Sequence, residues 1–99
     1  MTERMELPPI LDLVAARALH TELLRRRGAA LELDAGRVRR LGGQCLQILL
    51  AARAIWAADK QPLRFTALSE EFITALEVMG VSVEALTVPA PAGKDEVPA

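Results

Sequence analysis

Several residue types and patterns are scarce in this chain of 99 residues. It holds a single cysteine, Cys45, so an internal disulfide and a cysteine-based zinc site are both excluded. Aromatic residues make up only 3% of the chain, which leaves the core to leucine, isoleucine, valine and alanine. The sequence also lacks a long apolar run and the apolar stretch of a secretory signal, so we expect a cytoplasmic protein that does not insert into a membrane.

Net charge is also small, at −1, which argues against a general nucleic-acid binder. The charges are unevenly distributed along the chain. Residues 17–64 hold ten basic and four acidic groups, whereas residues 65–99 hold one basic and six acidic groups. The simplest interpretation is a set of solvated faces, and the alternative is a basic region that steers an acidic partner.

The first part of the chain predicts a strand followed by a helix. Residues 3–11 read as extended, and their two prolines indicate an edge strand or a strand plus a turn. Asp12 suits an N-cap, and we expect a helix over residues 13–27 that ends at Gly28. The residues expected on its buried stripe are Leu13, Ala16, His20, Leu23 and Leu24.

The middle of the chain predicts a second strand and the clearest helix. Residues 29–33 alternate as a strand with one better-buried face, and residues 34–36 break that pattern. After Gly42 and Gly43 we expect a helix over residues 44–58. Its buried stripe is predicted to hold Cys45, Ile48, Leu49, Ala52, Ile55 and Trp56.

The last part repeats the alternation of strand and helix. Residues 63–67 predict a strand, and Ser69 is a candidate N-cap for a helix that runs to Met79. Residues 81–86 are expected to form a final strand or extended piece. We expect one domain over residues 1–89 and a disordered polar tail over residues 90–99.

Strands that alternate with helices define the expected fold class. The predicted order is β-α-β-α-β-α-β with short connections, which indicates an α/β fold with parallel strand pairs. The sheet is expected to be mixed, with about four strands and helices on one face. Because the predicted strands alternate in polarity, the other face is expected to be open to water or to a partner.

Three features invite a chemical interpretation, and none of them defines an enzyme. His20 has no nucleophile or orienting carboxylate that the sequence places beside it, so a structural role is favoured. Cys45 lies on an apolar stripe near a helix start, where packing is the simpler explanation and a lowered thiol pKa the alternative. Gly42 and Gly43 precede a helix and suit an anion site or a tight turn, but no phosphate-binding loop, cofactor motif or metal-ligand spacing is present.

Taken together, these pieces resemble the STAS domain family, the sulphate-transporter and anti-sigma-factor-antagonist domains. The resemblance covers about residues 9–86 and depends on the order and spacing of three loose pieces. The first is Pro9–Asp12. The second comprises Leu31–Asp34, Val38, Leu41, Gly42, Gly43 and Leu46–Ala52. The third comprises Leu63–Phe65, Ser69, Leu76, Gly80 and Val81.

The resemblance also identifies a position where this chain departs from the family. Phosphorylated members open their second helix with an aspartate, a serine or threonine, a small residue and a glycine. Those positions fall on Gly42, Gly43, Gln44 and Cys45, and all four differ. Because glycine has no oxygen to accept a phosphoryl group, the family's phosphorylation switch is impossible at Gly43.

The function that the resemblance implies is a non-catalytic adaptor in bacterial signalling. Its expected partner is a kinase, an anti-sigma factor, or a chemotaxis or two-component signalling protein. The alternative is a structural subunit of an ABC-type lipid transport complex that binds the ATPase subunit, and a homodimer is compatible with either. The residues implied in partner binding are Asp12, Arg39, Arg40, Gly42, Gly43, Gln44 and Gln47.

Overall fold

The computed structural model describes residues 2–88, and these contain five strands and four helices. The elements follow the order β1 (Glu3–Glu6), β2 (Ile10–Leu11), α1 (Leu13–Arg25), β3 (Leu31–Ala35), β4 (Arg40–Leu41), α2 (Gly43–Ala58), β5 (Leu63–Leu68), α3 (Glu70–Val78) and α4 (Val83–Thr87). The expected tail over residues 90–99 and the expected domain boundary at residue 89 lie outside the described residues.

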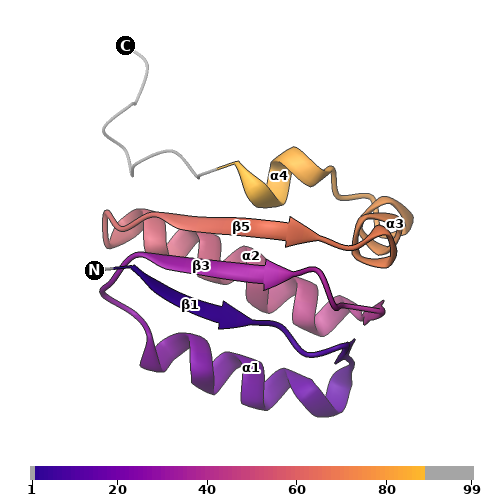
Figure 1. Cartoon of the computed structure of the whole chain (residues 1–99), viewed down its shortest axis with the longest axis horizontal. Helices are drawn as coiled ribbons and strands as arrows, with labels where there is room; N and C mark the ends of the chain where they lie inside the picture. The colour runs from indigo at the N-terminus through magenta and orange to yellow at the C-terminus, as the bar shows by residue number, and fades with distance from the viewer. Residues whose placement is uncertain (1, 89–99) are drawn as a thin grey trace.

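Two small parallel sheets form the frame of the molecule (Figure 1). The larger sheet has the order β1-β3-β5, with β3 in the centre, and the smaller one pairs β2 with β4. Every strand pairing among residues 2–88 is parallel, as the predicted alternation of strands and helices requires. The α/β class is therefore confirmed, but the described strand pairings are parallel rather than mixed as expected. The strands number five rather than about four, because two of them are only two residues long.

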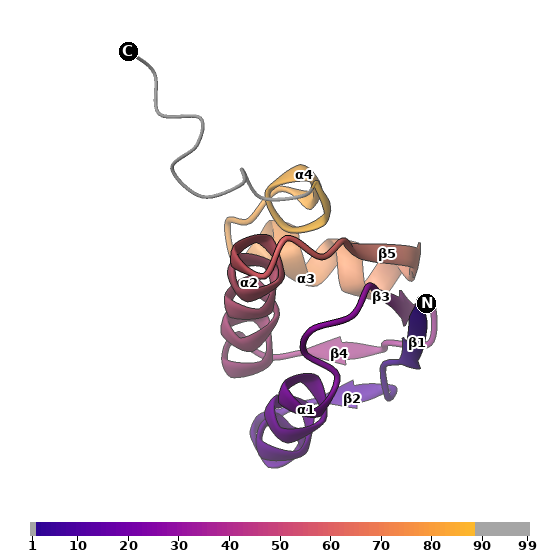
Figure 2. The same cartoon turned by 90° about the vertical axis from the view of Figure 1, so that its left-hand side faces the viewer.

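The two faces of the larger sheet differ in polarity. Leu31, Leu33 and Ala35 of β3 are buried, while Glu32 and Asp34 between them are half-buried on the opposite face. Figure 2 shows the sheet edge-on, with α1 and α2 on one side of it. The chain therefore has a helix-covered face and a polar face, as the sequence predicted.

Strand β3 extends further than the sequence indicated. Residues 34–36 were expected to break the strand, but Asp34 and Ala35 pair with β1 or β5. The Asp34 carboxylate accepts a hydrogen bond from the Gly36 N–H at 2.8 Å, so the turn begins only after the strand has ended. An aspartate at a strand end can thus serve both the strand and the turn that follows it.

Helix α1 begins where predicted but ends earlier and is rotated. It ends at Arg25 rather than Arg27, and its buried residues are Ala16, Leu19 and Leu23. Leu13, His20 and Leu24 are exposed, which corrects the expected stripe. The sequence pattern fits two adjacent stripes almost equally well, because a turn of the helix takes 3.6 residues.

Helix α2 is the central helix of the core. It begins at Gly43, one residue earlier than expected, and it buries Cys45, Leu46, Leu49, Ala52 and Trp56. Ile48 and Ile55 of the expected stripe are only partly buried. The Trp56 indole N–H donates a hydrogen bond to the Ala29 carbonyl at 2.8 Å, which fastens the helix to the segment before β3.

The final element corrects the sequence prediction. Residues 81–86 were expected to be extended, but Val83–Thr87 form the short helix α4. The Ser82 hydroxyl caps this helix by accepting a hydrogen bond from the Ala85 N–H at 3.1 Å. Leu86 is its single buried residue. A five-residue helix shows too little of its periodicity to be distinguished from a strand by apolar spacing alone.

Candidate functional site

The starts of α1 and α2 lie at the end of the sheet to which its strands point (Figure 1). The two helices contact each other on the same side of the sheet (Figure 2). Each helix start leaves backbone N–H groups without partners inside the helix, and the helix dipole adds positive partial charge there. This end is where a polar or anionic group of another molecule would meet the protein most favourably.

Asp12 fixes the start of α1. Its backbone is extended, and its carboxylate accepts a hydrogen bond from the Ala15 N–H at 3.0 Å. The predicted N-cap is therefore confirmed. Its carboxylate is engaged in holding the helix start, so its contribution to any partner contact would be made from a fixed position.

The pairing of β2 with β4 brings Asp12 next to the Gly42 turn. Leu11 pairs with Leu41, and the Gly42 N–H donates to the Leu11 carbonyl at 2.8 Å. A Cβ on Gly42 would lie 3.4 Å from that carbonyl oxygen, so a side chain there would be in van der Waals contact with β2. Two segments about thirty residues apart in the sequence thus form one surface, as the sequence-based site required.

Gly43, Gln44 and Gln47 lie on the exposed side of α2. All three are exposed, and a Cβ on Gly43 would meet no atom within 4 Å. Gly43 and Gln47 are one helical turn apart, so they share a face. Gly43, the residue that the resemblance matches to the family's phosphorylation position, is therefore exposed and carries no hydroxyl group.

Arg39 and Arg40 hold this end together through their backbone and leave their side chains exposed. Both backbone N–H groups donate to the Pro9 carbonyl, at 2.7 and 3.1 Å. Neither guanidinium forms an ion pair within residues 2–88. They line a shallow hollow on the side of α3, together with Glu70 and Glu71.

Gln44 lies on the other side, in a hollow between α1 and α2. Leu13, Arg17 and His20 of α1 and Ile48 of α2 complete this hollow. The predicted binding residues thus surround the helix starts, but they face two different hollows. His20 was placed on the buried stripe by the sequence, and the structure places it instead at this exposed hollow.

Sequence reasoning missed an apolar group at this end. Leu13 is 69% exposed and Val14 is 87% exposed, and Ile10 nearby in β2 is also exposed. In the first turn of α1, the described chain leaves most of the Leu13 and Val14 side chains uncovered. Their exposure could have been suspected from the sequence, because Leu13 and Val14 directly follow the N-cap residue at the end of the helix.

Cys45 is packed rather than reactive. Its side chain is buried, and its Sγ donates a hydrogen bond to the Asp12 carbonyl at 3.4 Å. Burial, together with the nearby Asp12 charge, raises the pKa of the Cys45 thiol. A raised pKa disfavours the nucleophilic thiolate, so the packing interpretation is supported over the redox alternative.

We call the surface formed by these residues the helix-start surface. It comprises Ile10, Asp12, Leu13, Val14, Arg39, Arg40, Gly42, Gly43, Gln44 and Gln47. Within residues 2–88, no three histidine, cysteine or acidic side chains gather in a way that would hold a metal ion. None of the helices in that part of the chain has the length and apolar character needed to cross a membrane.

The fold agrees with the result of comparison with known families. A family model described as "Mlab, STAS domain" matches residues 2–88, so the chain belongs to the STAS domain family. No curated protein matches the chain. No solved structure matches it either. STAS domains typically bind protein partners and are generally non-catalytic.

Proposed function

We propose that this protein is a non-catalytic adaptor in the bacterial cytoplasm that binds a signalling protein through its helix-start surface. The partner class is a kinase, an anti-sigma factor, or a chemotaxis or two-component protein. The observation that supports this most is the coincidence of two features. The position at which the family is phosphorylated, Gly43, lies open on the same end of the molecule as the exposed Leu13 and Val14.

The chemistry of the surface suits a protein partner. Exposed apolar side chains contribute binding energy when a partner covers them, and they are costly to leave in water. Arg39 and Arg40, which line a separate hollow at this end of the molecule, add electrostatic steering towards an acidic partner. Since Gly43 cannot be phosphorylated, release of the partner cannot be controlled at that position.

A second candidate function uses the same open surface, although the small STAS subunits of lipid transporters usually carry a threonine where this chain has Gly43. A docking surface that cannot be switched off at this position suits a permanent subunit, such as a structural STAS subunit of an ABC-type lipid transport complex. In that case the helix-start surface would bind the ATPase subunit. The two candidates use the same surface and differ in the identity of the partner.

An affinity capture from the native host distinguishes the candidates and tests the surface. The bait is the full chain, and its variant is Val14→Glu, which places a charge at a side chain that is 87% exposed. Val78→Glu is the matched control, because Val78 is 80% exposed on α3, outside the helix-start surface.

We expect one partner to be captured by the wild-type and Val78→Glu chains and to be lost with Val14→Glu. A signalling protein would support the adaptor, and a transporter ATPase would support the second candidate. Equal capture by all three baits would show that the helix-start surface is not where the partner binds.

A further inference from the structure

Strand β1 forms one edge of the larger sheet. Among residues 2–88, it pairs with β3 and with no other strand. The Glu3 and Leu7 N–H groups donate towards β3, to the carbonyls of Ala30 at 2.8 Å and Asp34 at 2.9 Å. Because backbone groups alternate in direction along a strand, the N–H and C=O groups of Arg4 and Glu6 face the free edge.

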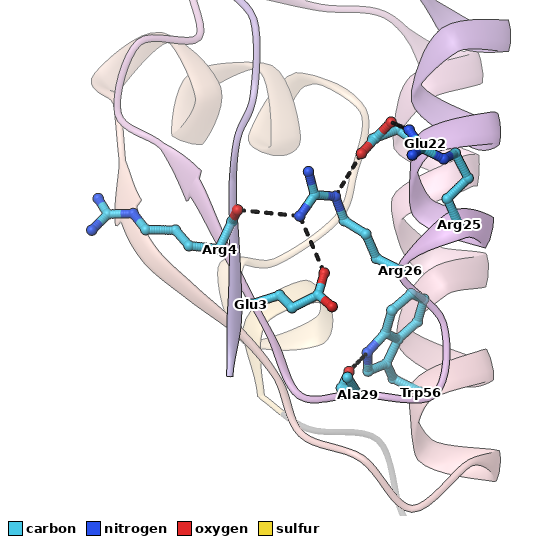
Figure 3. A network of polar contacts seen from close by, with 7 residues as sticks. All are labelled: Glu3, Arg4, Glu22, Arg25, Arg26, Ala29 and Trp56. Carbon is cyan, nitrogen blue, oxygen red and sulfur yellow. Dashed lines mark hydrogen bonds and ion pairs between the residues drawn. The ribbon is translucent and has the colours of Figure 1, made fainter. Parts of the chain in front are cut away.

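Within the described part of the chain, the Arg26 side chain lies at this edge. Arg26, which follows α1, places its guanidinium against β1, as Figure 3 shows. Its Nη1 donates to the outward carbonyl of Arg4 at 3.4 Å and to the Glu3 carboxylate at 3.3 Å. Its Nε donates to the Glu22 carboxylate at 2.7 Å, which holds the guanidinium in place.

The neighbouring arginine provides a contrast within the same turn. Arg25 also pairs with Glu22, at 3.0 Å, but its contacts do not include β1. The Arg25 side chain is 72% exposed, whereas that of Arg26 is 28% exposed. Contact with the edge is therefore specific to Arg26. A free strand edge is a template for pairing with another chain, and a charged side chain at the edge is a known means of blocking it.

We propose that the β1 edge is a strand-pairing surface for a second copy of this chain and that Arg26 keeps it closed. The sequence of β1 favours its own antiparallel pairing about a two-fold axis at Met5. In that register Arg4 lies opposite Glu6 of the second copy, and both residues carry the outward backbone groups that form a hydrogen-bonded pair.

The charges outside this pair extend the complementarity. Arg4 forms an ion pair with Asp34 at 2.9 Å, and Glu6 forms one with Arg37 at 3.3 Å. In the paired arrangement, the charges therefore alternate across the two-fold axis. Asp34 (negative) and Arg4 (positive) belong to one copy, and Glu6 (negative) and Arg37 (positive) belong to the second copy. Opposite charges facing each other across strands stabilise a pairing, and like charges destabilise it.

The test compares two methionine substitutions, which retain an unbranched side chain and remove only the guanidinium. Arg26→Met opens the edge, and Arg25→Met is the matched control because it removes the same charge and a contact to the same glutamate. Oligomeric state is measured by sedimentation equilibrium over a range of concentrations. A thermal melt confirms that each variant is folded.

We expect Arg26→Met to dimerise about tenfold or more tightly than the wild-type chain, with Arg25→Met unchanged. A double variant adds Arg4→Pro to Arg26→Met. Proline at position 4 removes the outward N–H and the positive charge that pairs with Glu6, and it breaks no hydrogen bond to β3, so the double variant should not dimerise. An unchanged state in Arg26→Met, equal dimerisation in Arg25→Met, or a dimer that survives Arg4→Pro would each overturn the proposal. None of these outcomes bears on partner binding at the helix-start surface.

Discussion

At the scale of single residues, Asp12 connects the two segments that form the helix-start surface. Its carboxylate caps α1, and its backbone carbonyl accepts a hydrogen bond from the Cys45 thiol of α2. One residue therefore fixes both the position of a helix start and its distance from the next helix. The local sequence predicted only the first of these roles, because the second depends on the pairing of β2 with β4.

Asp12→Ala should destabilise the fold through loss of the N-cap. The Ala15 N–H would lose its acceptor, and the free energy of unfolding should fall by about 1 kcal/mol. Asp12→Asn retains an oxygen acceptor and should lose much less. Urea denaturation of the three proteins measures the difference, and equal stability of the alanine and asparagine variants would contradict the capping role.

Cys45 should remain a protonated thiol, and alkylating reagents should reach it only when the protein unfolds locally or globally. Its pKa is raised, chiefly by burial and further by Asp12, so little thiolate forms near neutral pH. We expect alkylation of the native protein to be more than about a hundredfold slower than in denaturant. Rapid stoichiometric labelling of the folded chain would contradict this and restore the redox alternative.

At the scale of elements, Asp34 ties the end of β3 to its neighbours. Its carboxylate accepts from the Gly36 N–H at 2.8 Å and from the Arg4 guanidinium at 2.9 Å. The hydrogen bond from Gly36, followed by that from Arg4, lowers the pKa of Asp34 below its ordinary value of 3.8. The carboxylate is thus bound more tightly in the folded state when it is ionised.

This shift gives stability a defined dependence on pH. Because the folded-state pKa is lowered, the contribution is present above the ordinary value of 3.8 and is lost as the pH falls through the folded-state value. Asp34→Asn should therefore reduce the melting temperature more at pH 7 than at about pH 2. Equal losses at both pH values would show that the Asp34 charge does not contribute.

Element boundaries were predictable where a cap defines them. Asp12 and Ser69 each accept the expected hydrogen bond at a helix start, whereas α1 ends at Arg25, before Gly28 with its left-handed φ of 97°. The orientation of α1 was not predictable, since exposing Leu13 rather than Leu19 depends on where the sheet lies. Helix α4 was not predicted, because its apolar spacing also fits an extended segment and the Ser82 N-cap is what marks the helix start.

At the scale of the whole molecule, the sequence predicted which segments form the candidate site, but not the directions in which their side chains point. The site required Asp12 to lie beside Gly42, and the short β2-β4 pair places them together. Arg40 and Gln44, however, line separate hollows, one beside α3 and the other between α1 and α2. The direction in which a side chain points depends on how the helices and strands pack against one another, which no local sequence pattern encodes.

The central claim is that the helix-start surface binds the partner, and one affinity measurement tests it most directly. Gly43→Asp adds a side chain whose Cβ would meet no atom within 4 Å, so the fold should be retained. Ala54→Asp is the control, since it adds the same charge at an exposed position further along α2. Titration calorimetry against the captured partner should show at least about tenfold weaker binding for Gly43→Asp and unchanged binding for Ala54→Asp. Wild-type affinity in the Gly43→Asp protein would contradict the account.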